Sequence, residues 1–200
     1  MNNPCDSATL PTQPSSKDDP AGEALLDAYE IRVLGVMAEK EALTPDNYPM
    51  SLNGLTNGCN QMTSREPVMA LTEATVQDVL HTLMQKKFIA EVRQAGGRVP
   101  KYEHRMRIKW LLEQDKLAIL TLLMLRGMQT AGEIRNRAGR LHDFSTLEQV
   151  ETGLEFLMDK YPPLVARMTR AAGSKESRYM HLLAGQEALG QGEAAPCSGR

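Results

Sequence analysis

One short motif occurs twice in the chain, and this duplication limits the possible folds more than any other feature of the sequence. Leu-x-x-Leu-Met-x-Lys stands at residues 80–86 and again at residues 154–160. Each copy closes an apolar pattern with helical spacing and is followed by a β-rich segment, a glycine-containing turn and a Tyr-x-His, at residues 102–104 and 179–181. Matched elements at similar separation indicate a repeated structural unit. The sequence therefore predicts two consecutive domains of the same type.

In the first copy, apolar residues spaced three and four apart predict three helices. The first helix buries one stripe that includes Tyr29. The second starts after Ser51 and directs apolar residues as far as Met62 inward, and the third starts at Thr72. A strand, an Ala-Gly-Gly turn and a return strand then predict a β-hairpin within residues 88–104.

The second copy marks its helix starts more clearly. Thr130 with Glu133 and Ser145 with Glu148 both have the spacing of a capping box, in which hydroxyl and carboxylate satisfy free backbone amides. These pairs predict the starts of the middle and last helices. A second hairpin is predicted within residues 164–183.

Three helices followed by a hairpin is the winged-helix arrangement of the helix-turn-helix class. The predicted fold class is mostly α with small β-hairpins (α+β), as two tandem winged-helix domains at residues 24–106 and 107–184. Residues 1–23 and 185–200 are rich in proline, glycine and small polar residues, so we expect them to be mobile tails.

Composition excludes several classes of protein. Aromatic residues make up 4% of the chain, so both cores must be aliphatic. Three cysteines without a Cys-x-x-Cys pair argue against a disulfide framework or a zinc site. The N-terminal region lacks the pattern of a signal peptide, and the longest apolar run is too short to cross a bilayer. We therefore expect a cytoplasmic protein without membrane contact.

No catalytic pattern stands out in the sequence. The four histidines lack the spacing of metal ligands, and no glycine-rich phosphate loop follows a predicted strand. No serine or cysteine has a base placed beside it in sequence. These observations predict a non-enzymatic protein without cofactor or metal.

Three segments carry a resemblance to a known family. They are Tyr-Pro-Met-Ser-Leu-Asn at 48–53, Asn-Gly-Cys-Asn-Gln at 57–61 and Arg-Glu-Pro-Val at 65–68. With them, the chain resembles the bacterial YceH-like family from about residue 30 to residue 183. The resemblance implies cytoplasmic tandem winged helices and carries over no catalytic residue. Gly54 and Gly58 depart from good helix-forming sequence, at up to about 1 kcal/mol each; close packing would explain them, and so would drift.

The second predicted helix carries a stripe of amides on its polar side. Asn53, Asn57, Asn60 and Gln61 fall at i, i+4, i+7 and i+8. Amides can contact base edges or phosphates, and they can equally cap the following loop by bonding its backbone. Arg65, in that loop, either pairs with its neighbour Glu66 or is free to meet a phosphate.

The two third helices differ in charge. The first is expected to expose polar, nearly uncharged residues, with Gln77 and His81 among them. The second is expected to expose Glu148, Glu151, Glu155 and Asp159, four carboxylates that a phosphate surface would repel. We therefore expect unequal domains, the first offering a hydrogen-bonding surface and the second serving as a scaffold.

Positive charge collects on the wings and on one middle helix. These cations either contact phosphates or protect solvated strand edges from aggregation. On the first wing they are Arg93, Arg98, Lys101 and Arg105, on the second Arg167, Arg170, Lys175 and Arg178, and on the middle helix Arg135, Arg137 and Arg140.

Double-stranded DNA is the leading predicted ligand, on architecture, with phosphates contacted mainly through the wings. A net charge of −2 gives that prediction weak support. The alternative is a protein-interaction module, similar in architecture to tandem winged-helix subunits of chromosome-segregation complexes. Trp110 is expected to pack between the domains, with stacking on a base as the alternative. A homodimer is also expected, with the aliphatic first helices as a possible extra face.

Overall fold

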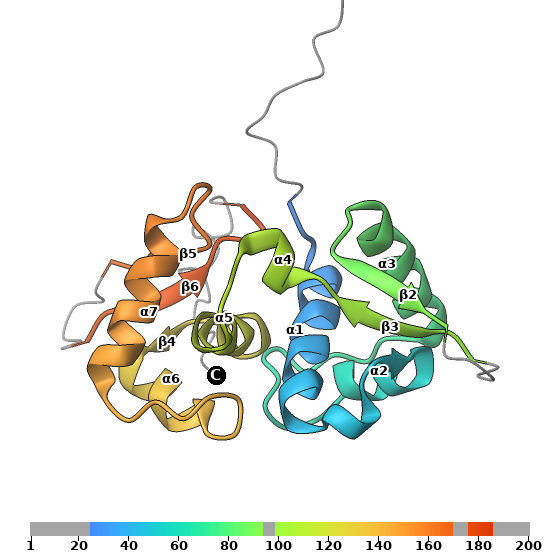
Figure 1. Ribbon diagram of the computed structural model, residues 1–200, viewed down its shortest axis with the longest axis horizontal. Helices are drawn as coiled ribbons and strands as arrows, with labels where there is room; N and C mark the ends of the chain where they lie inside the picture. Colours follow the sequence, from blue (N-terminus) through green and yellow to red (C-terminus); the bar gives the residue numbers. More distant parts are fainter. Residues whose placement is uncertain (1–24, 94–98, 170–175, 186–200) are drawn as a thin grey trace, which may run out of the picture.

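The computed structural model describes residues 25–93, 99–169 and 176–185, and it has one helix–hairpin arrangement twice in succession (Figure 1). The fold is α+β, as predicted. The first half holds α1 (Ala28–Leu43), the 3-10 helix η1 (Pro45–Asn47), β1 (Met50–Ser51), α2 (Leu52–Cys59), α3 (Glu73–Gln85), β2 (Ile89–Val92) and β3 (Lys101–His104). A short helix α4 (Met106–Trp110) leads to the second half, with α5 (Gln114–Arg126), β4 (Gln129–Thr130), α6 (Ala131–Ala138), α7 (Leu147–Asp159), β5 (Val165–Arg167) and β6 (Arg178–His181). With the exception of Gly185, both predicted tails lie outside the described residues.

Each half contains a three-stranded antiparallel sheet in which the predicted hairpin gains one short strand. The strand orders are β1-β3-β2 and β4-β6-β5. Met50 pairs with Tyr102 and Gln129 pairs with Tyr179, so the tyrosines of the two Tyr-x-His motifs occupy matching places. Strands β1 and β4 have two residues each, too few to give an alternating pattern, and the sequence did not predict them.

Helix caps fix where the middle and last helices begin. Ser51 caps α2, Thr72 caps α3, and the predicted capping box of Thr130 and Glu133 is present at α6. The predicted box of Ser145 and Glu148 is wrong by one residue. Thr146 accepts from the Gln149 amide, and the Gln149 side chain accepts in return from the backbone of Thr146, so α7 begins one residue later.

The predicted inward position of Met62 is also wrong. Helix α2 ends at Cys59, and the Met62 side chain is 78% exposed. The side chain of Asn60 makes two hydrogen bonds with the backbone of Leu71, as donor at 2.8 Å and as acceptor at 2.7 Å. These bonds hold the following loop in place of a further helical turn.

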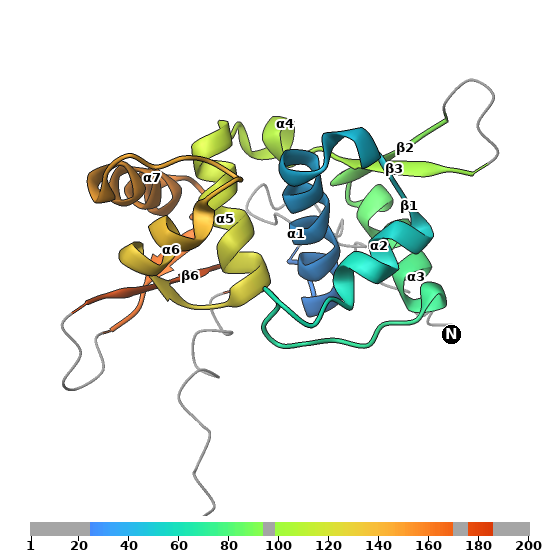
Figure 2. The same cartoon turned by 90° about the horizontal axis from the view of Figure 1, so that it is seen from below.

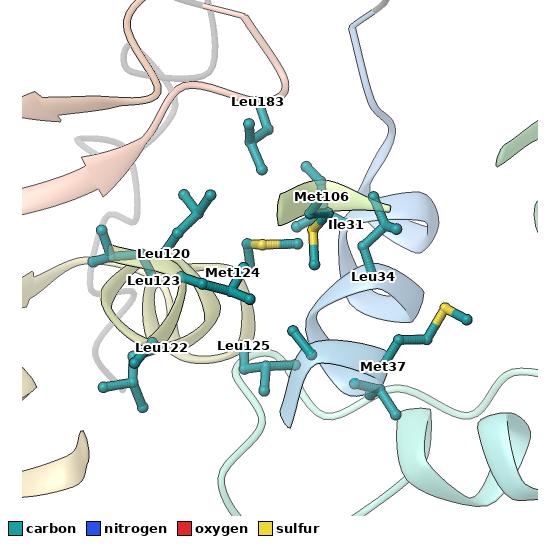
Figure 3. Packing of buried hydrophobic residues seen from close by; sticks show 14 of the residues in the cluster. Ile31, Leu34, Met37, Met106, Leu120, Leu122, Leu123, Met124, Leu125 and Leu183 are labelled. Carbon is teal, nitrogen blue, oxygen red and sulfur yellow. The ribbon is translucent and has the colours of Figure 1, made fainter. Parts of the chain in front are cut away.

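Helix α1 is buried on all sides over residues 30–39, although its sequence predicted a single buried stripe. Its second face packs against α5, where Ile31 and Leu34 face Leu123 and Met124 across the two helices (Figure 3). A methyl group added at Gly35 would lie 2.9 Å from Leu125 Cδ2, so the two helices are in close contact. The expected free face of the first helix is therefore occupied within the same chain. Tyr29, by contrast, is exposed.

Close packing also accounts for one of the two α2 glycines. A Cβ at Gly58 would lie 2.6 Å from Val36 Cγ1, whereas at Gly54 the nearest atom, Ser51 Oγ, would be 3.4 Å away. The glycine at 58 thus lets α2 approach α1, and nothing in the structure explains the glycine at 54.

The two hairpins extend from opposite sides of this shared helical centre (Figure 2). Helix α3 and strands β2 and β3 lie toward one end of the long axis, and α7 with β5 and β6 toward the other (Figure 1). In the described residues, no helix has the length and apolar character needed to cross a membrane.

Candidate interaction surfaces

The outer face of α3 and the exposed asparagines of α2 form one polar surface in the first half. Gln77 Nε2 lies 3.2 Å from His81 Nε2, one helical turn apart on α3. Asn57 Nδ2 donates to Asn53 Oδ1 at 3.1 Å, and Asn53 Nδ2 donates to Glu73 Oε1 at 3.0 Å. The structure therefore brings the first two predicted amides beside the start of α3, where they are exposed to solvent.

Asn60 has the loop-capping role that was the alternative to ligand contact, whereas Gln61 bonds a side chain of that loop and not its backbone. Asn60 holds the backbone of Leu71, as described above. Gln61 Oε1 accepts a hydrogen bond from Arg65 Nη2 at 2.8 Å, so its carbonyl is already used inside the protein.

Arg65 lies in the interior of the protein, and both predictions made for it are wrong. Its side chain has no exposed surface, and it forms a two-pronged ion pair with Glu39 on α1, at 3.1 and 2.6 Å. It also donates to the carbonyl oxygens of Gly58 and Ser64. The carboxylate partner is thus 26 positions away rather than the adjacent Glu66, and the guanidinium cannot reach a phosphate on the surface.

Several of the predicted surface cations are already engaged by protein oxygens. Arg93 pairs with Glu91 at 2.8 Å, and Arg137 donates to Gln129 Oε1 at 2.8 Å. Arg135 donates to the carbonyl oxygens of Phe144 and Ser145. Arg105 lies 3.9 Å from Glu103, Arg178 bonds the Met128 carbonyl and pairs with Glu133, and Arg167 stacks on the Tyr179 ring.

The remaining predicted cations are distributed between the halves. Lys101 is half-buried on β3, and Arg140 is exposed just after α6. Arg98, Arg170 and Lys175 lie outside the described residues. The described cations therefore do not gather into one continuous basic surface around either third helix.

Helix α7 presents the acidic stripe that the sequence predicted. Glu148, Glu151, Glu155 and Asp159 are all exposed, and their spacing places them along one side of the helix. We call these four residues the acidic ridge. Because their carboxylates form no ion pair with a lysine or arginine of the described residues, the ridge keeps its negative charge facing solvent.

Two hollows border α7. One, of about 470 Å³, lies between α7 and the start of α5 and is lined by Glu148, Phe144 and His142 among others. The other, of about 270 Å³, lies between α7, α6 and the second hairpin and is lined by Leu147, Glu151 and Arg167 among others.

Apolar side chains also reach the surface of α7, which the sequence did not indicate. Leu147 is 41% exposed and Phe156 is 42% exposed. The ammonium groups of Lys116 and Lys160 lie 5.3 and 5.1 Å from the centre of the Phe156 ring. Helix α7 thus combines carboxylates with a ring whose face already accepts cations.

A second surface lies where α3 ends and α4 passes over β2. It is a groove of about 500 Å³ that carries three cations on a partly apolar floor. We call it the basic groove, and its lining residues are Met84, Lys87, Ile89, Ala90, Arg105, Ile108 and Lys109.

Trp110 is buried beside this groove and is not available to stack on a base. Its ring packs edge-on against Phe88, with ring centres 5.2 Å apart. Lys109 Nζ lies 4.4 Å from the centre of the Phe88 ring and donates a hydrogen bond to the Lys86 carbonyl oxygen. These contacts anchor α4 to the first half.

A polar cluster joins α1, β3 and α4. His104 Nε2 lies 3.2 Å from Glu41 Oε2, and Arg107 Nη2 lies 3.2 Å from the same oxygen. The hydrogen bond with His104 lowers the pKa of the Glu41 carboxyl. The Tyr48 hydroxyl accepts from the His104 amide at 2.7 Å, and burial raises the pKa of that hydroxyl. These contacts tie the start of α4 to α1 and β3, while His104 Nδ1 is buried without a hydrogen-bond partner among the described residues.

A family model described as "Protein of unknown function, DUF480" matches residues 26–174, which is most of the chain. The chain belongs to the DUF480 family. This agrees with the resemblance to YceH-like proteins noted in the sequence.

Similar DUF480 relatives come from several bacteria. A UPF0502 protein of Herminiimonas arsenicoxydans is 65% identical over 175 residues, covering 88% of this chain and 73% of the relative. A UPF0502 protein of a Janthinobacterium species is 68% identical over 165 residues, covering 82% and 71%. One of an Azoarcus species is 51% identical over 181 residues, covering 90% and 77%. The names of these relatives state no enzymatic activity.

The DUF480 match contains both surfaces described above. The basic groove and the acidic ridge lie between residues 84 and 159, inside the matched segment 26–174. Among the described residues, histidine, cysteine and carboxylate side chains form no group of three or more that could hold a metal ion. Burial raises the pKa of the Cys59 thiol to about 12, so this thiol stays protonated at neutral pH.

Proposed function

We propose that this chain is a tandem winged-helix protein-interaction module whose acidic ridge binds a basic segment of a partner protein. The winged-helix interpretation rests on element order: helix, short strand, two helices and a hairpin, repeated with the same strand order. We assign the two domains to residues 24–106 and 107–184.

The single observation that carries the proposal is the charge of α7. In the winged-helix arrangement the third helix is the usual recognition element. Here that helix exposes four carboxylates of the acidic ridge, and nearby arginines such as Arg135 and Arg178 are held by protein oxygens. Phosphates would be repelled by such a helix, whereas lysine or arginine side chains would pair with it.

The surroundings of α7 suit a peptide as the partner better than they suit a partner with a flat surface. Hollows on both sides leave room for side chains, and the exposed Phe156 ring already accepts ammonium groups on its faces. A segment with alternating basic and apolar residues would match this surface in charge and shape.

Affinity capture from nuclease-treated bacterial lysate tests the proposal, with the double variant Glu151→Gln/Glu155→Gln as the probe. We expect a stoichiometric protein to be retained by the wild type and lost from the variant. Gln77→Ala/His81→Ala, on the third helix of the other domain, is the matched control and should retain the partner. Equal retention by both variants would overturn the proposal, as would capture that needs nucleic acid.

Double-stranded DNA is the second candidate, favoured by the exposed hydrogen-bonding face of α3. Gln77 and His81 lie on that face with Asn53 and Asn57 beside it, and amides can bond base edges in the major groove. If this function holds, Gln77→Ala/His81→Ala changes sequence preference in a gel-shift screen at low salt, and Glu151→Gln/Glu155→Gln leaves affinity unchanged or raises it. Removing each arginine that contacts a phosphate lowers the slope of log affinity against log salt concentration by about one unit. Failure to retain any fragment would exclude DNA as the ligand.

A further inference from the structure

The basic groove is a surface that the proposed function does not use. Its cations are Lys87, Arg105 and Lys109, and its floor is formed by apolar side chains of α3, β2 and α4. At its rim Ile108 is 73% exposed, and Leu111 just after α4 is 76% exposed. Two large aliphatic side chains facing solvent beside three cations indicate a surface that binds an apolar and acidic partner.

The cations of the groove are not neutralised within the chain. Arg105 is 3.9 Å from Glu103, at the limit of an ion pair, and both side chains are more than a third exposed. Lys109 meets a carbonyl oxygen and the Phe88 ring, neither of which carries a net charge. An exposed ion pair such as that of Arg105 with Glu103 contributes little energy, so the carboxylate of a partner competes with it easily.

The same chain carries a surface of matching chemistry. Helix α7 holds four carboxylates together with exposed Leu147 and Phe156. Building on the proposed function, we infer that the acidic ridge of one copy docks in the basic groove of a second copy. Carboxylates of the ridge would meet Lys87, Arg105 and Lys109, and the exposed apolar groups of both surfaces would be covered.

The contact is head-to-tail because the groove and the ridge are different surfaces: the groove is lined by residues of α3, β2 and α4, and the ridge lies on α7. These elements are set apart along the long axis of the molecule (Figure 1). Such contacts form rings when the rotation closes and extended chains when it does not. The aliphatic face of α1 cannot serve instead, since α5 covers it. A basic partner segment that occupies the ridge would also release the second copy.

Charge exchange tests this pairing directly by sedimentation velocity over a range of concentrations at low salt. The groove variant Lys87→Glu/Arg105→Glu and the ridge variant Glu151→Lys/Glu155→Lys each place like charges across the contact. We expect the full-length wild type to self-associate, and we expect the association of each variant alone to be weaker by a factor of about ten or more. An equimolar mixture of the two variants restores opposite charges at the contact and should associate again.

Controls separate this result from general charge effects. Arg93→Glu/Arg140→Glu makes the same change in net charge outside the groove and should associate as the wild type does, and all variants should keep the wild-type urea midpoint. A wild type that stays monomeric at high concentration overturns the inference, as does a mixture that stays dissociated. In either case, ridge-dependent capture of another protein would still stand, so the two proposals fail separately.

Discussion

Replacing Arg65 by alanine removes the most heavily engaged cation in the described structure. The guanidinium pairs with Glu39 at 2.6 and 3.1 Å and donates to the carbonyl oxygens of Gly58 and Ser64 and to the side-chain oxygen of Gln61. It therefore holds the loop between α2 and α3 against α1. Beyond it, the Glu66 amide donates to the Leu125 carbonyl at 2.8 Å, which links that loop to α5.

The expected loss follows from the groups left behind. Glu39 is 8% exposed and would keep only the longer ion pair with Lys40, at 3.7 Å, so its buried charge would be poorly compensated. Breaking a buried ion pair from one side costs about 3–5 kcal/mol. Because stability as a whole is about 5–15 kcal/mol for a natural domain, Arg65→Ala should remove a large part of it.

Urea denaturation followed by circular dichroism measures the loss as a fall in the midpoint at unchanged slope. The double variant Glu39→Leu/Arg65→Met, which replaces both charges by apolar side chains, should regain most of the stability. A loss of less than about 1 kcal/mol for Arg65→Ala would place the residue among ordinary surface cations and refute this account of the loop.

Three further predictions concern packing, pH and thiol reactivity. Gly35→Ala should destabilise the protein by about 1–3 kcal/mol in urea, because its methyl group would press on Leu125, whereas Gly54→Ala should be neutral or stabilising by up to about 1 kcal/mol; the reverse order would contradict the described α1–α5 contact. Burial lowers the pKa of His181 to about 4, below its unfolded value, so the neutral form stabilises the fold at neutral pH and up to about 3 kcal/mol is lost as pH falls from about 6.5 toward 4. His181→Leu should make the urea midpoint depend less on pH over that range. If the midpoint of the variant falls with pH as steeply as that of the wild type, other groups cause the loss. With the two other cysteines replaced by serine, Cys59 should react with a thiol reagent only after unfolding; rapid reaction of the folded protein would show that α2 opens readily.

Several features that depend on neighbours in the sequence were predicted correctly. The start of α3 at Thr72 and the capping box of Thr130 with Glu133 follow from groups three residues apart. The two hairpins follow from strand patterns joined by glycine-containing turns. Exposure of the acidic ridge likewise follows from helical spacing, because the apolar residues of α7 fix which side is buried.

The errors lie where two local choices have similar energies. Ser145 and Thr146 each stand three residues before a side chain able to complete a cap, and the structure uses the second pair. At the end of α2, the bonds from Asn60 to the Leu71 backbone compete with a further helical turn and displace Met62 outward. Spacing alone does not rank such alternatives.

Contacts between distant parts of the chain were decided only by the tertiary structure. The sequence by itself determined the repeated helices and hairpins, because caps, turns and periodicity act over a few residues. It did not determine that Arg65 would pair with Glu39, or that α5 would cover the second face of α1. It also did not place Lys87 and Arg105 beside the exposed Ile108. Each of these depends on how packed helices bring together residues far apart in the chain, and apolar contact between helices carries no direction that a local pattern could record.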